Sequence, residues 1–86
     1  MRDFHELKVW EMGQSLALKI YAVTRNFPKD EKFGLTNQIR RAALSIPTNV
    51  AEGSGRGSGA DLCRFLQIAF ASACEVDSLL DMATKL

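Results

Sequence analysis

The sequence predicts a small all-α protein, and two observations support this fold class. Apolar residues recur at steps of three and four over three long stretches, which is the spacing of amphipathic helices. No stretch shows the alternation of apolar and polar residues that is typical of a β-strand. The chain has 86 residues, 47% hydrophobic and 24% charged, which predicts a single helical-bundle domain over residues 1–86.

The first helix is expected from Leu7 to Phe27. Pro28 has no backbone N–H and should stop this helix, and residues 28–32 form a short charged connector. The apolar stripe consists of Val9, Trp10, Gly13, Leu16, Ala17, Ile20, Val23 and Phe27.

The second helix is expected to begin near Leu35 or Thr36 and to run to about Glu52. Pro47 falls inside it, so we expect a kink there, with a complete break as the alternative. The glycine-rich run 53–59 has no apolar residue to pack and should end the helix. The apolar stripe consists of Leu35, Ile39, Ala42, Ala43, Ile46 and Val50.

The third helix is expected over residues 60–86, with Ser58 and Asp61 as a start that resembles a capping box. It has apolar residues on nearly every side, so it should be covered on more than one side, by another subunit or by a fourth helix. We therefore expect a homo-oligomer. The stripe consists of Leu62, Leu66, Ala69, Ala73, Val76, Leu80 and Ala83, and Phe65, Ile68, Phe70, Leu79, Met82 and Leu86 lie outside it.

The formal net charge of +1 argues against a strongly basic nucleic-acid binder, taken as a monomer. Residues 1–57 carry nine Lys/Arg against six Asp/Glu, and residues 58–86 carry two against four. A symmetric assembly could gather this asymmetry into a charged surface. The N-terminus has no apolar signal core and the longest uncharged runs are about half a membrane span, which predicts a cytoplasmic protein without membrane contact.

No catalytic or metal site is expected. His5 is the only histidine and has no second ligand or nucleophile beside it in the sequence, which predicts a protein that is not an enzyme and has no cofactor or small-molecule substrate. Gly55, Gly57 and Ala60 formally match a dinucleotide fingerprint, but no strand precedes them, so a flexible loop is favoured. Cys63 and Cys74 are about 16 Å apart along one helix, too far for a disulfide, and are expected to be buried.

Arg40 and Arg41 are the most informative polar residues. Two guanidiniums beside the apolar stripe can bind phosphates or pair internally with acids. Arg41, Ser45, Thr48 and Glu52 fall on one helix face, so an internal polar network competes with phosphate binding. Both interpretations stay open.

Three stretches together resemble a known family. They are Val9-Trp10 with Tyr21, the segment 27–31 followed by Phe33-Gly34-Leu35, and the specific segment 38–53, and Arg56 and the segment 64–69 agree with them. They resemble the four-helix-bundle proteins encoded in intervening sequences of large-subunit ribosomal RNA genes. The similarity covers essentially the whole chain.

The resemblance implies an up-and-down four-helix bundle that forms a ring-like homopentamer. It extends to the accessory proteins of diversity-generating retroelements, which bind nucleic acid and a reverse transcriptase through basic surfaces. This chain ends where its third helix ends, so the fourth helix of the family is expected to be missing.

Our leading interpretation is a non-enzymatic oligomeric adaptor for structured RNA or a ribonucleoprotein such as a retroelement reverse transcriptase. The residues expected to contact phosphates are Arg40, Arg41, Arg56 and Lys32. The alternative is a purely structural or protein-binding bundle without a nucleic-acid ligand, in which Arg41 and Glu52 form a buried network.

Overall fold

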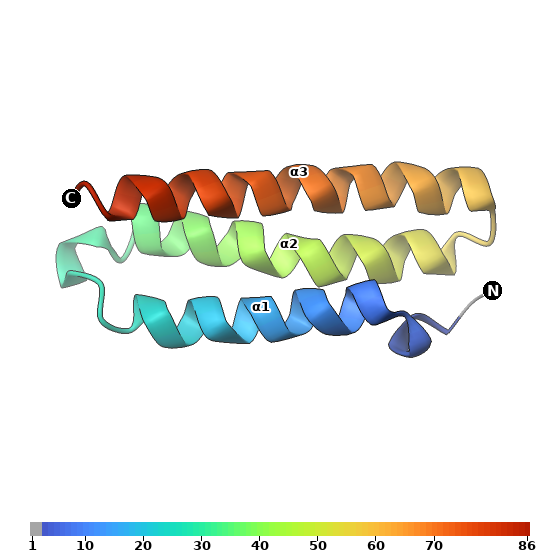
Figure 1. Cartoon of the computed structure of the whole chain (residues 1–86), viewed down its shortest axis with the longest axis horizontal. Coiled ribbons are helices and arrows are strands. Elements are labelled where there is room, and N and C mark those ends of the chain that lie inside the picture. Colours follow the sequence, from blue (N-terminus) through green and yellow to red (C-terminus); the bar gives the residue numbers. More distant parts are fainter. Residues whose placement is uncertain (1–2) are drawn as a thin grey trace.

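The computed structural model describes residues 3–86, which form three α-helices and two short 3-10 helices (Figure 1). Helix α1 spans Lys8–Thr24, α2 spans Leu35–Gly55 and α3 spans Gly59–Ala83; η1 covers Phe4–Glu6 and η2 covers Lys29–Glu31. Residues 3–86 contain no strand, and successive helices alternate in direction. The predicted all-α, up-and-down arrangement is confirmed.

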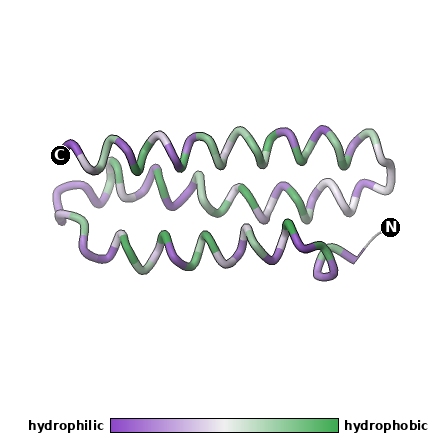
Figure 2. Tube along the Cα trace, in the orientation of Figure 1, coloured by the Kyte–Doolittle hydropathy of each residue, from purple (hydrophilic) through white to green (hydrophobic). Residues whose placement is uncertain are grey.

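Helix α2 lies between the other two helices. Helices α1 and α3 each pack on α2 and, within the described residues, not on each other (Figure 1). Hydrophobic residues recur along all three helices (Figure 2), and α2 contributes the two largest fully buried side chains, Ile39 and Val50. The buried core consists of Ala17 and Ile20 from α1, Ile39, Ala42, Ala43, Ile46 and Val50 from α2, and Ala69 and Val76 from α3.

Helix α1 is shorter than the sequence suggested. It ends at Thr24, and the next residues form tighter turns, with the Phe27 N–H donating to the Thr24 carbonyl at 3.1 Å. The expectation of a helix through Phe27 is therefore wrong. Val9 and Val23, assigned to the apolar stripe, are exposed.

Helix α2 continues through Pro47 and past Glu52 to Gly55. A complete break at Pro47 is therefore wrong, while the kink stays a prediction. The last turn of the helix includes Gly53 because this glycine packs closely on α3: a Cβ atom there would lie 2.6 Å from the Cβ of Phe65. Gly57, with a φ of 84°, adopts the left-handed conformation that follows the helix.

Helix α3 begins as predicted, because the Ser58 hydroxyl accepts a hydrogen bond of 3.1 Å from the Asp61 N–H. Its end at Ala83 comes before the expected Leu86. Phe65 was placed outside the apolar stripe, but it is buried against Gly53. Cys63 and Cys74 are free and exposed, so the expectation that they are buried is also wrong.

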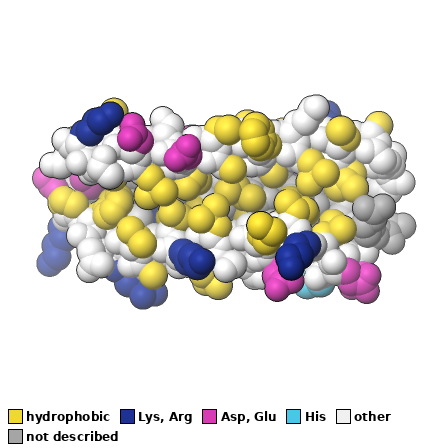
Figure 3. Space-filling model, in the orientation of Figure 1, with side chains coloured by type: hydrophobic (Ala, Val, Ile, Leu, Met, Phe, Trp, Pro, Cys, Tyr) yellow, Lys and Arg dark blue, Asp and Glu magenta, His cyan; other side chains and the backbone are white. Residues whose placement is uncertain are grey.

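Apolar side chains also reach the surface. Figure 3 shows hydrophobic side chains along the length of the molecule between α3 and α1, the two helices that flank α2 in this view. Several large apolar residues are exposed, among them Met12, Leu18, Leu44, Ile68, Phe70 and Met82. Within residues 3–86, no helix combines the length and the apolar character that crossing a bilayer requires.

Candidate functional site

Arg40 connects α2 to the last turn of α1. Its Nε donates to the Thr24 hydroxyl at 2.7 Å, and its Nη2 donates to the Tyr21 carbonyl at 3.3 Å. The guanidinium also lies over the Tyr21 ring, with 4.6 Å between Cζ and the ring centroid. Of the two neighbouring arginines, Arg40 is therefore the one that is held by hydrogen bonds within the chain, although not to an acid.

A basic pocket surrounds this connection. It has a volume of about 340 Å³ and lies where η2 joins α1 to α2. Its lining residues include four cations and no acid: Arg25, Lys29, Lys32 and Arg40. We call these four residues the basic pocket. Within residues 3–86 none of the four forms an ion pair, so the pocket concentrates uncompensated positive charge.

The neighbouring acids point elsewhere. Asp30 and Glu31 line a different pocket, together with Ala83 and Leu86 near the end of α3. The Glu31 carboxylate accepts a hydrogen bond of 3.1 Å from the Leu35 N–H at the start of α2. The cations and the acids of the connector thus line two different pockets, which share Phe27 and Pro28.

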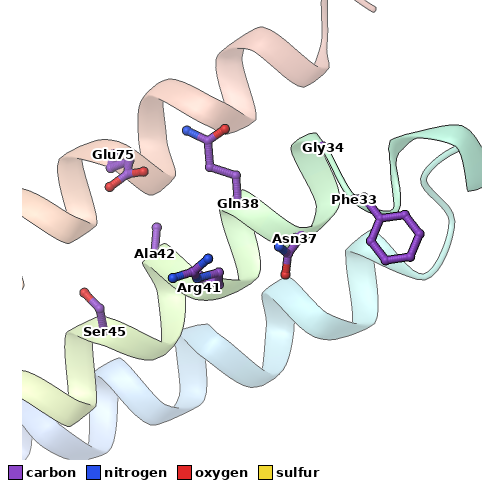
Figure 4. Close-up of a pocket in the computed structure, with 8 residues that line it drawn as sticks. All are labelled: Phe33, Gly34, Asn37, Gln38, Arg41, Ala42, Ser45 and Glu75. Carbon is purple, nitrogen blue, oxygen red and sulfur yellow. The ribbon is translucent and has the colours of Figure 1, made fainter.

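Arg41 lies outside the basic pocket and is exposed. It lines a groove between α2 and α3, which it shares with Glu75 (Figure 4). Arg41 makes no ion pair within the described chain, and Glu52 is exposed and pairs with Arg56 instead. The expected buried network of Arg41 with Glu52 is therefore wrong, since the two side chains have different surroundings.

Arg56 lies at the other end of the bundle from Lys32, just after the last residue of α2. Its Nη2 donates to Glu52 at 2.7 Å, and its guanidinium lies 5.1 Å from the Phe65 ring centroid. Of the four residues predicted to contact phosphate, the structure thus brings together Lys32 and Arg40, while Arg41 and Arg56 stand apart.

Arg25 and Lys29 are the pocket residues that sequence reasoning missed. Lys29 and Lys32 are three residues apart around η2, a spacing that places both on one side of a tight helix. That spacing was a usable signal. Arg25 had none, because its approach to Arg40 depends on how α1 packs against α2.

The single histidine is part of a small aromatic cluster before α1. The His5 ring stacks on Phe4 and meets Trp10 edge-on, and its Nδ1 lies 2.8 Å from the Asp3 carboxylate. Hydrogen bonds from the His5 side chain and backbone lower the pKa of the Asp3 carboxyl. Within residues 3–86, no group of three His, Cys, Asp or Glu side chains is arranged to hold a metal ion.

These features define a class: a small helical bundle, without strands in the described part of the chain, that carries a cationic pocket. The chain belongs to the family of the 23S rRNA-intervening sequence protein, whose family model matches residues 5–86. The description of this family names no enzymatic activity. No curated protein matches the chain.

Proposed function

We propose that this protein is a non-enzymatic adaptor that binds structured RNA through the basic pocket. The observation that carries the proposal is the clustering of Arg25, Lys29, Lys32 and Arg40, with no acid among the residues that line the pocket. Phosphate groups are the natural ligands of such a cluster, and arginine offers them a planar set of donors. Arg40 uses two of its N–H groups on Thr24 and Tyr21, which holds the guanidinium in place and leaves other donors free.

Membership of the ribosomal RNA intervening-sequence family supports RNA as the polyanion. A net charge of +1 also fits a local contact better than a molecule that attracts nucleic acid over its whole surface. We further propose that copies of the chain assemble as a pentamer, so that repeated pockets raise affinity. A ribonucleoprotein such as a retroelement reverse transcriptase is then the partner that we favour.

Affinity for an RNA hairpin tests the proposal. With four phosphates contacted per pocket, affinity should fall about a hundredfold between 50 and 200 mM salt. Reversing two charges, Lys29→Glu with Lys32→Glu, should weaken binding strongly and flatten this salt dependence. The matched control is Lys8→Glu with Lys19→Glu, two exposed lysines of α1 outside the pocket. Equal losses in the two double variants would show that only net charge matters and would contradict the proposal.

A second candidate function rests on the exposed apolar residues. Leu18, 68% exposed, and Phe70, 71% exposed, belong to different helices and would be covered in a bundle that binds protein alone. Under this alternative, hairpin RNA should not bind at any salt concentration. The same titration therefore separates the two functions.

A further inference from the structure

The groove that contains Arg41 differs in character from the basic pocket. Its volume is about 460 Å³, within the range of roughly 300–1,000 Å³ that is typical of ligand sites. Asn37, Arg41 and Ser45 follow one another at steps of four, so they share one face of α2 (Figure 4). Glu75 approaches from α3, and Phe33 lies just before α2 at the end of the row.

Phe33 is an aromatic ring presented to solvent. It is 87% exposed, and the Lys32 ammonium lies 5.5 Å from its ring centroid. No core contact accounts for an apolar side chain in this position. A free aromatic face with a cation beside it is the arrangement on which proteins stack unpaired nucleobases.

The rest of the groove offers polar groups that are free to pair. Within the described chain, the side chains of Asn37, Gln38, Arg41 and Glu75 make no hydrogen bond or ion pair with other residues. Side-chain amides and guanidiniums are the groups that read the edges of bases. Glu75 repels phosphate but accepts hydrogen bonds from amino groups, so this part of the groove favours a base edge over the sugar–phosphate backbone.

The dimensions indicate more than one nucleotide. Eight residues of helix separate Asn37 from Ser45, which is about 12 Å along α2. A duplex cannot use such a site, because its bases are already stacked and paired and the A-form major groove is too narrow for side chains. A strand that leaves the groove also meets a cation for its phosphates, since Lys32 of the basic pocket lies over the Phe33 ring.

From this juxtaposition we infer that the groove binds a short unpaired segment of RNA, a loop or a single strand, with one base stacked on Phe33 and another read by Arg41 and Glu75. The inference rests on the proposed function and adds what kind of RNA is recognised. The basic pocket supplies attraction for any polyanion, whereas the groove supplies the preference for unpaired bases.

The test compares two RNAs of equal charge: a hairpin with an eight-nucleotide loop and a fully paired duplex. Fluorescence anisotropy at constant salt should give about tenfold tighter binding of the looped RNA. Phe33→Ala should remove that preference, while Phe33→Tyr, which keeps the ring, should retain it. Both variants should have the circular dichroism spectrum of the parent, because Phe33 is exposed.

The outcomes separate this inference from the proposed function. Equal binding of both RNAs, unchanged by Phe33→Ala but weakened by Lys29→Glu with Lys32→Glu, would overturn the inference and leave the proposed function standing. Absence of binding to either RNA would overturn both. A change in solution mass on Phe33→Ala would place the ring in a contact between copies and would also overturn the inference.

Base identity in the loop gives a second readout. A cytosine presents an amino group to Glu75, whereas a uracil presents a carbonyl oxygen that the carboxylate repels. Hairpins with a cytosine loop should bind several-fold tighter than those with a uracil loop, and Glu75→Gln should narrow that difference. An identical narrowing in Asp77→Asn, an exposed acid of α3 outside the groove, would contradict base reading by Glu75.

Discussion

The Arg40 guanidinium and the Tyr21 ring form the closest cation–π contact among the described residues, with 4.6 Å between Cζ and the centroid. The Arg40 Nε also donates to Thr24 at 2.7 Å. Together these contacts fasten the end of α1 to α2. Because hydrogen bonds from a charged group contribute about 1.5–3 kcal/mol, Arg40→Ala should lower the free energy of unfolding by about 2 kcal/mol in urea denaturation.

Arg41→Ala is the control for this substitution. Arg41 is exposed and makes no hydrogen bond within the described chain, so its removal should change the free energy of unfolding by less than about 0.5 kcal/mol. A loss of stability as large as that of Arg40→Ala would contradict this difference between the two arginines.

Gly53 and Gly55 should respond oppositely to alanine. At Gly53 the new Cβ would lie 2.6 Å from the Phe65 Cβ and 3.3 Å from the Leu62 Cα, so α2 and α3 must separate. We expect Gly53→Ala to destabilise the fold by about 1–3 kcal/mol, more than the gain in helix propensity offsets. At Gly55 nothing lies within 4 Å, so Gly55→Ala should be neutral or stabilising by up to about 1 kcal/mol. Equal thermal denaturation midpoints for Gly53→Ala and Gly55→Ala would contradict the close packing of Gly53 on α3.

The same glycine shows where the sequence ceased to be informative. The start of α3 could be predicted from a local signal, because Ser58 caps the helix within a few residues. Pro28 marked the end of α1 only within a few residues, since that helix already ends at Thr24. Gly53 resembled a terminator, and only the approach of Phe65 from α3 explains its place inside α2. The burial of Phe65 could not be predicted for the same reason, because it depends on the absence of a side chain at Gly53, twelve residues earlier.

The candidate site also contains residues that the sequence could indicate and residues that only the packing of helices brings together. Lys32 and Arg40 could be chosen from residue type alone, because lysine and arginine are the side chains that bind phosphate. Their grouping with Arg25 is a consequence of packing between α1 and α2, which no local pattern encodes. The groove beside Phe33 was missed because its polar residues come from two helices, and Glu75 joins the others only in three dimensions.

Ser58 should contribute as the N-cap of α3. Its hydroxyl accepts from the Asp61 N–H at 3.1 Å, so Ser58→Ala should lower the free energy of unfolding by about 1 kcal/mol. Ser78→Ala, an exposed change within α3, should be neutral or slightly stabilising, because alanine is the better helix former. Chemical denaturation of both variants makes the comparison, and an equal loss in the two would rule out capping as the cause.

Asp3 should titrate below the ordinary range of aspartate. Hydrogen bonds from the His5 side chain and backbone favour the charged carboxylate, which lowers its pKa in the folded state. Because the pKa is lower in the folded state, the ionised Asp3 carboxylate stabilises the fold at pH values above its unfolded-state pKa. This stabilisation is lost as the pH falls through the folded-state pKa. An NMR titration of the Asp3 carboxyl carbon should show the low midpoint, and His5→Ala should raise it part of the way toward the ordinary value, because the backbone N–H of residue 5 still donates. A midpoint that His5→Ala leaves unchanged would exclude the side-chain hydrogen bond as the cause.

Helix α3 should carry a contact between copies of the chain. It packs on α2 alone within residues 3–86, and its Phe70 and Met82 side chains remain 71% and 52% exposed. Water contact on this scale is unfavourable by roughly 25 cal/mol for each Å² of apolar surface, so association that covers these residues is favoured. Light scattering should therefore give a mass that is a multiple of 9.5 kDa, and Phe70→Glu should lower it because the interface would then bury a charge.

Ser78→Glu adds the same charge to the same helix at a polar, exposed position and should leave the mass unchanged. A parent protein that stays at 9.5 kDa across micromolar concentrations would show that α3 tolerates its exposed side chains without a partner.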